Sequence, residues 1–128
     1  MGVLNLTPDS FSDGGKFNSF KKATKRIKNM INSGANIIDV GGESTRPGSK
    51  IISQKNELKR VKQVIKGFKK KYPKILLSVD TRKSLVINFS LKHRADIIND
   101  VSCFQHDPKS FSAIKDKNIW KIIHHMQG

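Results

Sequence analysis

The amino-acid sequence predicts an α/β fold built on a parallel sheet, and two patterns support this prediction. Short runs of β-branched residues and leucine alternate with longer segments of helical periodicity, and each run ends in a polar residue. The chain has 128 residues, of which 36% are hydrophobic, and this is enough for one packed domain. Strands that alternate with helices form parallel sheets through right-handed crossovers. Open doubly wound sheets and (β/α)8 barrels both satisfy this pattern.

Five runs have the composition of strands that are buried on both faces. Buried parallel strands are almost continuously apolar, whereas half-exposed strands alternate apolar and polar residues. Each of the five is three or four residues long and ends in Asn, Asp or His. They lie at residues 3–5, 37–39, 78–80, 97–100 and 122–124.

The segments between the first three runs predict two amphipathic helices. In the first, which starts at Ser19, apolar residues recur every three or four positions, and Gly34 suits the C-terminal cap. In the second, which starts at Ser53, apolar residues form one arc and lysines form another, and Pro73 follows the end.

Two further helices are expected in the second half of the chain. Apolar residues at positions 85, 86 and 89 predict a short third helix. Asp107 and Pro108 suit the N-cap and first helical position of a fourth. The expected order is therefore β-α-β-α-β-α-β-α-β.

The polar residues that end the runs indicate a functional site. In both candidate folds, the carboxyl ends of the parallel strands meet at one edge of the sheet, and sites form there. Asp and Asn also start turns and cap helices, so one such residue indicates little. Five in succession favour a site.

Two loops that follow strands are rich in glycine, hydroxyl groups and short acids, at residues 5–15 and 41–49. Glycines let backbone N–H groups approach an anion. Thr45 and Arg46 could bind phosphate oxygens, and Phe11 could cover a flat ligand. On composition alone, a pair of ordinary turns is an equal alternative.

The charge of the chain admits two interpretations. There are 25 Lys and Arg residues against 10 acids, which gives a net charge of +15. Clustered cations would indicate nucleic-acid binding. Here the basic residues are dispersed, and aromatic residues do not interleave with them as a base-stacking surface requires. We therefore favour a solvated basic surface and expect no nucleic-acid partner.

The sequence also predicts a compartment. No run of 18 apolar residues is present, so we expect no transmembrane helix and no membrane partner. The first residues lack the basic and apolar regions of a secretory signal. The single cysteine, Cys103, suits a reducing compartment, and the expected location is cytoplasmic.

Several stretches of the sequence resemble a known family. Residues 1–15 resemble the opening signature of the dihydropteroate synthases, and residues 38–48 resemble their second signature. Residues 78–81, 96–102 and 125–128 match the next three strand ends of that family in order. The resemblance covers the whole chain, and the first two motifs are too long for a chance match.

The resemblance implies a fold and a reaction. The fold is a (β/α)8 TIM barrel of the pterin-binding type, of which residues 1–128 would form the N-terminal part, with about the first five strands and four helices. The enzyme is a transferase of folate biosynthesis. It condenses 6-hydroxymethyl-7,8-dihydropterin diphosphate with p-aminobenzoate to give 7,8-dihydropteroate and diphosphate, with Mg²⁺ as its cofactor. The full-length form would be a homodimer.

The resemblance assigns catalytic roles to three strand ends. Asn5 resembles the residue that helps to hold Mg²⁺ with the diphosphate, and an amide oxygen is a suitable ligand for this ion. Asp80 and Asn99 resemble the floor of the pterin pocket, where a carboxylate accepts hydrogen bonds and an amide both donates and accepts them. Met126 resembles a residue beside the pterin, and a core methionine is the alternative.

The remaining roles belong to the two loops. Phe11 and Pro47 resemble residues that wall the aminobenzoate site. Thr45 and Arg46 resemble second-loop residues near the diphosphate, and Asp13 is the expected partner of Arg46.

The length of the chain limits these implications, because a (β/α)8 barrel needs about 250 residues. We therefore expect a fragment of a larger synthase. The alternatives are an inactive truncated remnant, half of a split barrel, and a methyltetrahydrofolate-type methyltransferase domain. The last needs neither of the two loops.

Overall fold

The computed structural model of the chain describes residues 1–6, 16–43, 52–100, 109 and 120–123. Strands and helices alternate from the first strand to the fourth, as the sequence predicts. In chain order they are β1 (Gly2–Asn5), α1 (Lys16–Asn32), β2 (Ile37–Gly41), α2 (Gln54–Lys71), β3 (Leu76–Asp80), α3 (Ser84–Lys92), β4 (Ile97–Asp100) and β5 (Trp120–Ile123).

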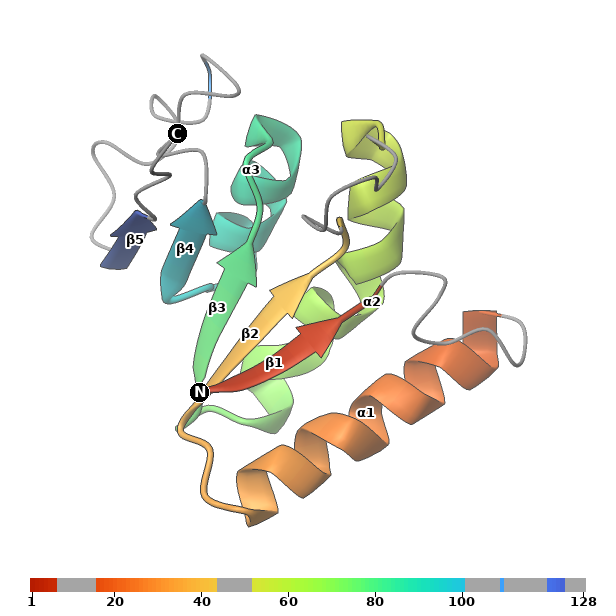
Figure 1. Cartoon of the computed structure of the whole chain (residues 1–128), viewed down its shortest axis with the longest axis vertical. Coiled ribbons are helices and arrows are strands. Elements are labelled where there is room, and N and C mark those ends of the chain that lie inside the picture. Colours follow the sequence, from red (N-terminus) through yellow and green to blue (C-terminus); the bar gives the residue numbers. More distant parts are fainter. Residues whose placement is uncertain (7–15, 44–51, 101–108, 110–119, 124–128) are drawn as a thin grey trace, which may run out of the picture.

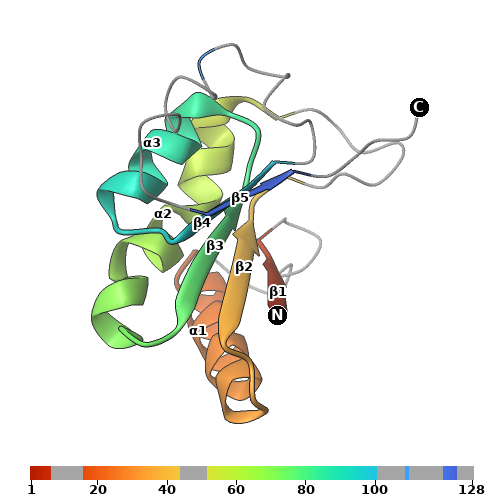
Figure 2. The same ribbon diagram turned by 90° about the vertical axis from the view of Figure 1, so that its left-hand side faces the viewer.

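The strands form one parallel sheet in the order β1-β2-β3-β4-β5. Each strand pairs with its neighbour in sequence, so every carboxyl end lies at the same edge (Figure 1). The three helices cover one face of the sheet (Figure 2). Sequential parallel pairing with all helices on one side is the arrangement of a (β/α)8 barrel rather than of a doubly wound sheet, which has helices on both faces.

The two faces of the sheet differ in chemistry because successive side chains point to opposite sides. Leu4, Val40, Val79 and Ile98 are register partners and are fully buried in the core under the helices. The next row on the other face is mixed, with Val3 exposed, Asp39 and Ser78 buried, and Ile97 beside them. The face that none of the described helices covers therefore carries buried polar groups in the middle of the sheet.

The element boundaries differ slightly from the sequence prediction. The second strand continues past Asp39 to Gly41, so Asp39 lies inside it rather than at its end. The first helix begins at Lys16, before the expected Ser19. Residue 124 and the predicted fourth helix lie outside the described residues, apart from Lys109.

α2 shows how local sequence fixes a helix. The Oγ of Ser53, the N-cap residue, accepts a hydrogen bond from the backbone N–H of Asn56 at 3.2 Å. This bond satisfies one N–H that has no partner inside the helix. Val61, Ile65 and Phe68 are buried at helical spacing against the sheet. The lysines of the opposite arc are exposed, apart from Lys69, which is partly buried beside Asp96.

α1 and α3 end in the same way. After α1, Gly34 has a φ of +107°, its N–H binds the carbonyl of Ile31, and the N–H of Ala35 binds the carbonyl of Met30. After α3, Arg94 has a φ of +66° and occupies the position that Gly34 has after α1. Each helix thus ends in two backbone hydrogen bonds that form a Schellman motif. Glycine is favoured at the residue with positive φ because it has no Cβ. The cap predicted at Gly34 is therefore confirmed.

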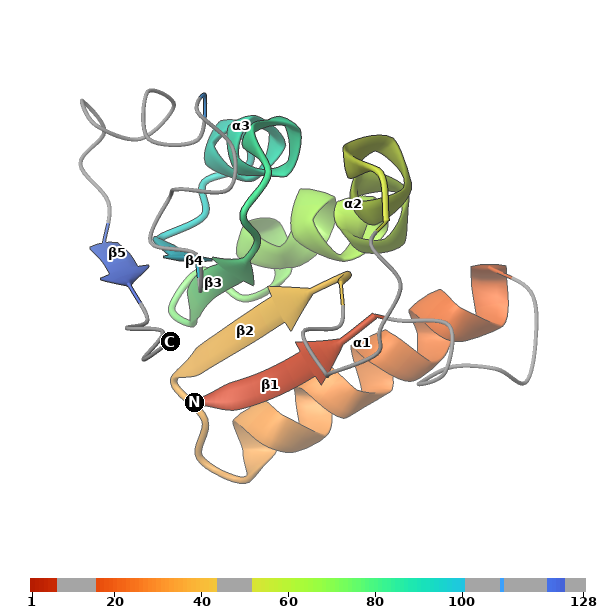
Figure 3. The same ribbon diagram turned by 45° about the horizontal axis from the view of Figure 1, so that its top comes forward.

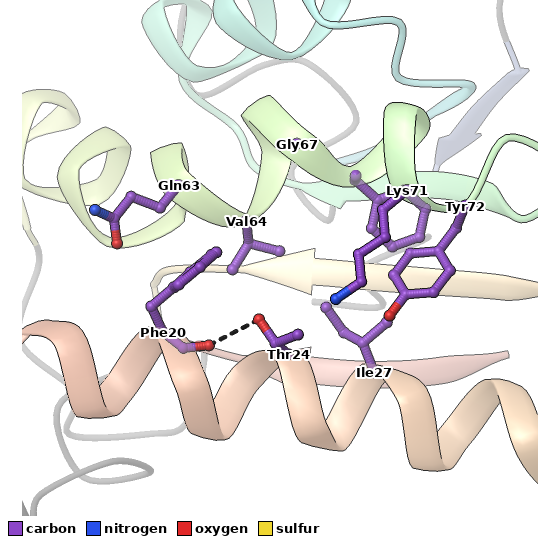
Figure 4. A pocket seen from close by; sticks show the side chains of 9 residues that line it. Phe20, Thr24, Ile27, Gln63, Val64, Gly67, Lys71 and Tyr72 are labelled. Atoms are coloured by element: carbon purple, nitrogen blue, oxygen red, sulfur yellow. Dashed lines mark hydrogen bonds between the residues drawn. The ribbon is translucent and has the colours of Figure 1, made fainter.

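A hollow of about 160 Å³ separates α1 from α2 (Figure 4). Phe20, Thr24 and Ile27 line it from α1, and Val64 and Phe68 are among the residues on the other side. It lies in the helical layer, on the side of the sheet away from the polar face. Within the part of the chain that is described, no helix is long and apolar enough to cross a bilayer.

Candidate active site at the carboxyl edge of the sheet

The three residues assigned to catalysis from the sequence lie in one row across the sheet. Asn5 pairs in register with Gly41, Gly41 with Asp80, and Asp80 with Asn99. Register partners present their side chains on the same face, here the one opposite the described helices. The row crosses β1 to β4 at their carboxyl ends, which come forward in Figure 3. The sheet therefore brings together residues that are up to 94 positions apart in sequence.

Asp80 lies among other carboxyl groups. Burial, together with the nearby charges of Asp39, Glu57, Asp100 and Glu43, raises the pKa of Asp80 from 3.8 to about 7. Near neutral pH the side chain can therefore be present in either form. A carboxyl group in this state can accept a hydrogen bond as an anion or donate one as an acid.

Asn99 is buried, with 7% of its surface exposed. Its Oδ1 has no hydrogen-bond partner among the described residues. A buried amide oxygen without a partner costs free energy, so native proteins rarely retain one outside a binding site. The backbone carbonyl of Asn99 accepts from the N–H of Thr81 at 3.1 Å, which holds β4 against the end of β3. This bond ties the backbone of Asn99 to the end of β3, and the buried Oδ1 remains an acceptor without a partner among the described residues.

Gly41 leaves the row open between Asn5 and Asp80. A Cβ at this position would lie 3.3 Å from the Cβ of Asp80 and 3.7 Å from its Oδ2. The first distance is tighter than ordinary van der Waals contact. Any larger residue at position 41 would therefore crowd the carboxyl group. Glycine keeps the space over the middle of the row clear.

A second polar pair lies one layer deeper on the same face. Ser78 donates from its hydroxyl to Oδ1 of Asp39 at 2.6 Å, and both residues are buried. Asp39 and Ser78 are register partners on β2 and β3, two positions before Gly41 and Asp80. The negative charge of Asp39 is one of the causes of the raised pKa of Asp80.

An ionic network borders the row where β2 and β3 end. Lys83 contacts Glu43 at 2.9 Å and Glu57 at 3.1 Å, and Arg82 contacts the other oxygen of Glu43 at 3.0 Å. The hydroxyl of Thr81 donates to Glu57 at 2.5 Å. The Glu57 side chain is 1% exposed and that of Lys83 is 7% exposed. Buried charges of this kind are tolerated only when they are paired and hydrogen-bonded.

The network determines the charge of Glu43. Burial alone would raise the pKa of this carboxyl group, but the hydrogen bonds and positive charges of Lys83 and Arg82 outweigh burial and lower the pKa below its usual value. Glu43 is therefore ionised at neutral pH. Among the described residues, Asp80 forms no ion pair with a lysine or arginine, and the pKa values of the two carboxyl groups therefore shift in opposite directions.

The sequence interpretation did not identify this network. One signal was present, because Glu57 is the only acid in α2 and lies on the same arc as buried Val61. A charged residue on an apolar arc indicates a buried partner. Nothing in the sequence pointed to Lys83, which is one of 20 lysines and lies 26 residues after Glu57. Only the crossover between β2 and β3 brings them together.

The loop residues assigned from the resemblance lie outside the described part of the chain. They are Phe11, Asp13, Thr45, Arg46, Pro47 and Met126.

Asn5 could contact a magnesium ion through its amide oxygen, with water and phosphate supplying most of the ligands. The side chain of Asn5 is exposed at the end of β1. Within the described ranges, no group of three or more His, Cys, Asp or Glu residues could hold a metal. Asp80 is two strands away, about 10 Å at the usual strand spacing. A single amide oxygen suits Mg²⁺, which commonly keeps waters and binds substrate phosphates.

The sequence profile of the pterin-binding enzymes matches residues 1–128. The chain belongs to the pterin-binding enzyme family. The dihydropteroate synthase of Bacillus subtilis is 47% identical over 125 residues, which are 98% of this chain and 44% of that protein. The family and the barrel-type fold predicted from the sequence are thus confirmed.

Solved structures of the pterin-binding family agree with this assignment. The dihydropteroate synthase of Clostridium difficile, determined in the presence of pteroic acid, has a TM-score of 0.91 at 43% identity and covers 100% of this chain and 49% of that chain. The enzyme of Xanthomonas albilineans, determined with 4-aminobenzoic acid, has a TM-score of 0.89 at 37% identity, over 98% and 46% of the two chains. The chain therefore spans less than half the length of these relatives.

Proposed function

We propose that this chain supplies the pterin-binding half of a dihydropteroate synthase site. The reaction joins 6-hydroxymethyl-7,8-dihydropterin diphosphate to p-aminobenzoate and releases diphosphate. The observation that carries the proposal is the row of Asn5, Asp80 and Asn99, in which Asn99 presents a buried amide oxygen without a partner. Pterins carry a ring N–H and an amino group that such a row can bind.

Asp80 and Asn99 would orient the pterin ring. The ring N–H and amino groups donate to the Asp80 carboxylate and to Oδ1 of Asn99. The carboxylate is then the form that binds, and hydrogen bonds to a carboxylate favour its charged form. A pterin bound here satisfies the Asn99 oxygen, and a ring that lacks these donors leaves it unsatisfied, which gives specificity.

The chemistry takes place above the row. The bond between the pterin methylene carbon and the diphosphate oxygen breaks, and the amine nitrogen of p-aminobenzoate bonds to that carbon and loses a proton. When bound, Mg²⁺ supplies a Lewis acid that stabilises the negative charge of the leaving diphosphate. Asn5 would hold this ion through its amide oxygen. None of these bond changes requires a nucleophilic side chain, and we assign none.

Two loops complete the proposed site. Phe11 and Pro47 would wall the aminobenzoate, Thr45 and Arg46 would lie near the diphosphate with Asp13 beside Arg46, and Met126 would pack beside the pterin. Water exclusion and alignment of the amine are the expected contributions of these loops.

The setting of the reaction is part of the proposal. Residues 1–128 would form part of a single barrel domain, and the full-length form would be a homodimer. Cys103, the single cysteine, suits a reducing compartment, so we propose the cytoplasm.

The proposal is tested by following dihydropteroate formation with two proteins. One is the 128-residue chain, and the other is this chain joined to the C-terminal remainder of the Bacillus subtilis relative. Activity of the joined protein that is blocked by a sulfonamide, and reduced at least 100-fold by Asp80→Ala, supports the proposal. Activity of the chain alone would support it and show that the chain is sufficient. Inactivity of a folded joined protein, or full activity of its Asp80→Ala variant, would overturn it.

A further inference from the structure

Lys83 binds three acceptors at once. Its Nζ donates to Oε2 of Glu43 at 2.9 Å, to Oε1 of Glu57 at 3.1 Å and to the backbone carbonyl of Ile52 at 2.7 Å. An ammonium group has three N–H donors, so each donor of Lys83 has an acceptor. The side chain is 7% exposed, and this arrangement therefore lies inside the protein.

The acceptors of Lys83 include both ends of one connection. Glu43 lies just after β2, and Ile52 lies just before α2. The N–H of Ile52 also lies 3.4 Å from Oε2 of Glu43. Glu43 and Ile52 are the residues on either side of positions 44–51. Lys83, from the connection between β3 and α3, therefore binds both ends of the connection between β2 and α2.

The same lysine is tied to the strand that carries Asp80. Lys83 is three residues after Asp80, and its backbone N–H donates to Oγ1 of Thr81 at 3.2 Å. The hydroxyl of Thr81 donates to Glu57, and its N–H binds the carbonyl of Asn99. The network thus connects the ends of the 44–51 connection to the row that we propose binds the pterin.

We infer that Lys83 is a positioning residue that fixes both ends of the 44–51 connection relative to Asp80 and Asn99. The effect on catalysis rests on the proposed function, which assigns Arg46 and Pro47 of this connection to the second substrate and the diphosphate. Loss of Lys83 would leave the pterin row in place and release the ends of the connection. The binding of p-aminobenzoate would then weaken more than the binding of the pterin.

The chain offers a matched control for this inference. Lys69 binds one carboxylate, where Lys83 binds two, and one backbone carbonyl, with Nζ 2.9 Å from Oδ2 of Asp96 and 2.9 Å from the carbonyl of Ile75. These partners lie before β4 and β3, at the amino edge of the sheet, opposite the row. Lys69→Met therefore removes similar bonds from a place where barrels carry stability rather than function.

Two measurements test the inference. In the joined protein, Lys83→Met should raise the KM for p-aminobenzoate at least tenfold more than the KM for the pterin diphosphate, whereas Lys69→Met should change both by less than twofold. In the 128-residue chain, hydrogen exchange at the Ile52 amide should become at least tenfold faster in Lys83→Met but not in Lys69→Met. Glu43→Gln keeps the contact between Lys83 and Glu57 and replaces Lys83→Met if that variant does not fold. It should also raise the KM for p-aminobenzoate and speed hydrogen exchange at Ile52.

The outcomes separate this inference from the proposed function. If the joined protein with the native residues forms no dihydropteroate, the proposed function fails, and exchange at Ile52 still decides the role of Lys83. If that protein is active but Lys83→Met and Lys69→Met have equal effects on both KM values and on exchange at Ile52, Lys83 has no positioning role.

Discussion

Asp80 lies in surroundings that disfavour its charged form, and this has a consequence for stability. Its pKa rises from 3.8 to about 7, mainly because the group is buried and also because other carboxylates are near. The folded state therefore holds this proton more tightly than the unfolded state does. The stability from this group is fully present below a pH of about 4 and is lost as the pH rises through about 7.

We predict that Asp80→Asn removes this loss. The pKa shift limits this loss of unfolding free energy to about 4 kcal/mol. Because Asp80 is only partly buried, we expect a loss of about 1–3 kcal/mol. The free energy of unfolding should be similar in the two proteins at pH 4 and higher in the variant at pH 8. Urea denaturation across this range measures the difference. Parallel profiles for the two proteins would show that Asp80 keeps an ordinary pKa.

Asn99 allows binding to be separated from stability. Its Oδ1 is buried without a partner among the described residues, so Asn99→Leu removes a group that costs free energy and keeps a similar volume. We predict that the free energy of unfolding is unchanged or rises by up to about 1 kcal/mol, whereas pterin affinity falls at least tenfold. Denaturation and fluorescence titration with a pterin measure the two quantities.

Ser78→Ala is the control for Asn99, since the hydroxyl of Ser78 is also buried but has a partner in Asp39. This change should lower the free energy of unfolding by about 1–3 kcal/mol. If Asn99→Leu instead lowers stability and pterin affinity together, Asn99 is a structural residue and the proposed pterin floor is wrong.

At the scale of the elements, the two Schellman motifs form a natural comparison. Gly34 and Arg94 occupy the same position after α1 and α3, and both have a positive φ. A left-handed conformation costs a residue with a Cβ about 1 kcal/mol more than glycine. The end of α3 is therefore less stable than it could be.

We predict that Arg94→Gly raises the free energy of unfolding by about 1 kcal/mol and that Gly34→Ala lowers it by a similar amount. No heavy atom lies within 4 Å of a Cβ placed at Gly34, so the second change tests the backbone alone. Thermal and chemical denaturation of the single variants provide the measurement. Changes of the same sign in both variants would contradict this account.

The elements themselves could be predicted because their signals are local. The strand at 97–100 begins with two isoleucines and ends in two polar residues, and α2 has a capping serine and an apolar arc. The local pattern predicts the end of β2 at Asp39, because a polar residue there is typical of a strand end, but Ser78 of the next strand donates a hydrogen bond to Asp39. A cross-strand partner leaves no trace in the local pattern.

The candidate site divides in the same way. Asn5, Asp80 and Asn99 could be placed at one edge of a sheet because parallel strands carry their carboxyl ends together. The contacts of Lys83 with Glu43 and Glu57 could not be predicted from the sequence. They join the segment after β3 to the segment after β2 and to α2, and they depend on the packing of α2 against the sheet. The position of the row can therefore be predicted from the sequence, whereas the ionic network beside it is seen only in the tertiary structure.

At the scale of the whole molecule, the dominant feature is the net charge of +15. Lysines on the exposed arc of α2 contribute to it, among them Lys62 and Lys66. Like charges spread over one small protein repel one another, and folding brings them closer together. The buried pairs around Lys83 are screened by salt much less than these surface charges are.

We predict that raising NaCl from 0.01 M to 0.1 M, which shortens the screening length from about 30 Å to about 10 Å, raises Tm by about 3–6 °C. The double variant Lys62→Gln, Lys66→Gln should start with a higher Tm at low salt and gain less from the added salt, since two of the repelling charges are gone. Thermal unfolding followed by circular dichroism at several salt concentrations measures both effects. A Tm that falls with salt would show that favourable ion pairs outweigh repulsion across the surface, and the dispersed lysines would then need another physical explanation.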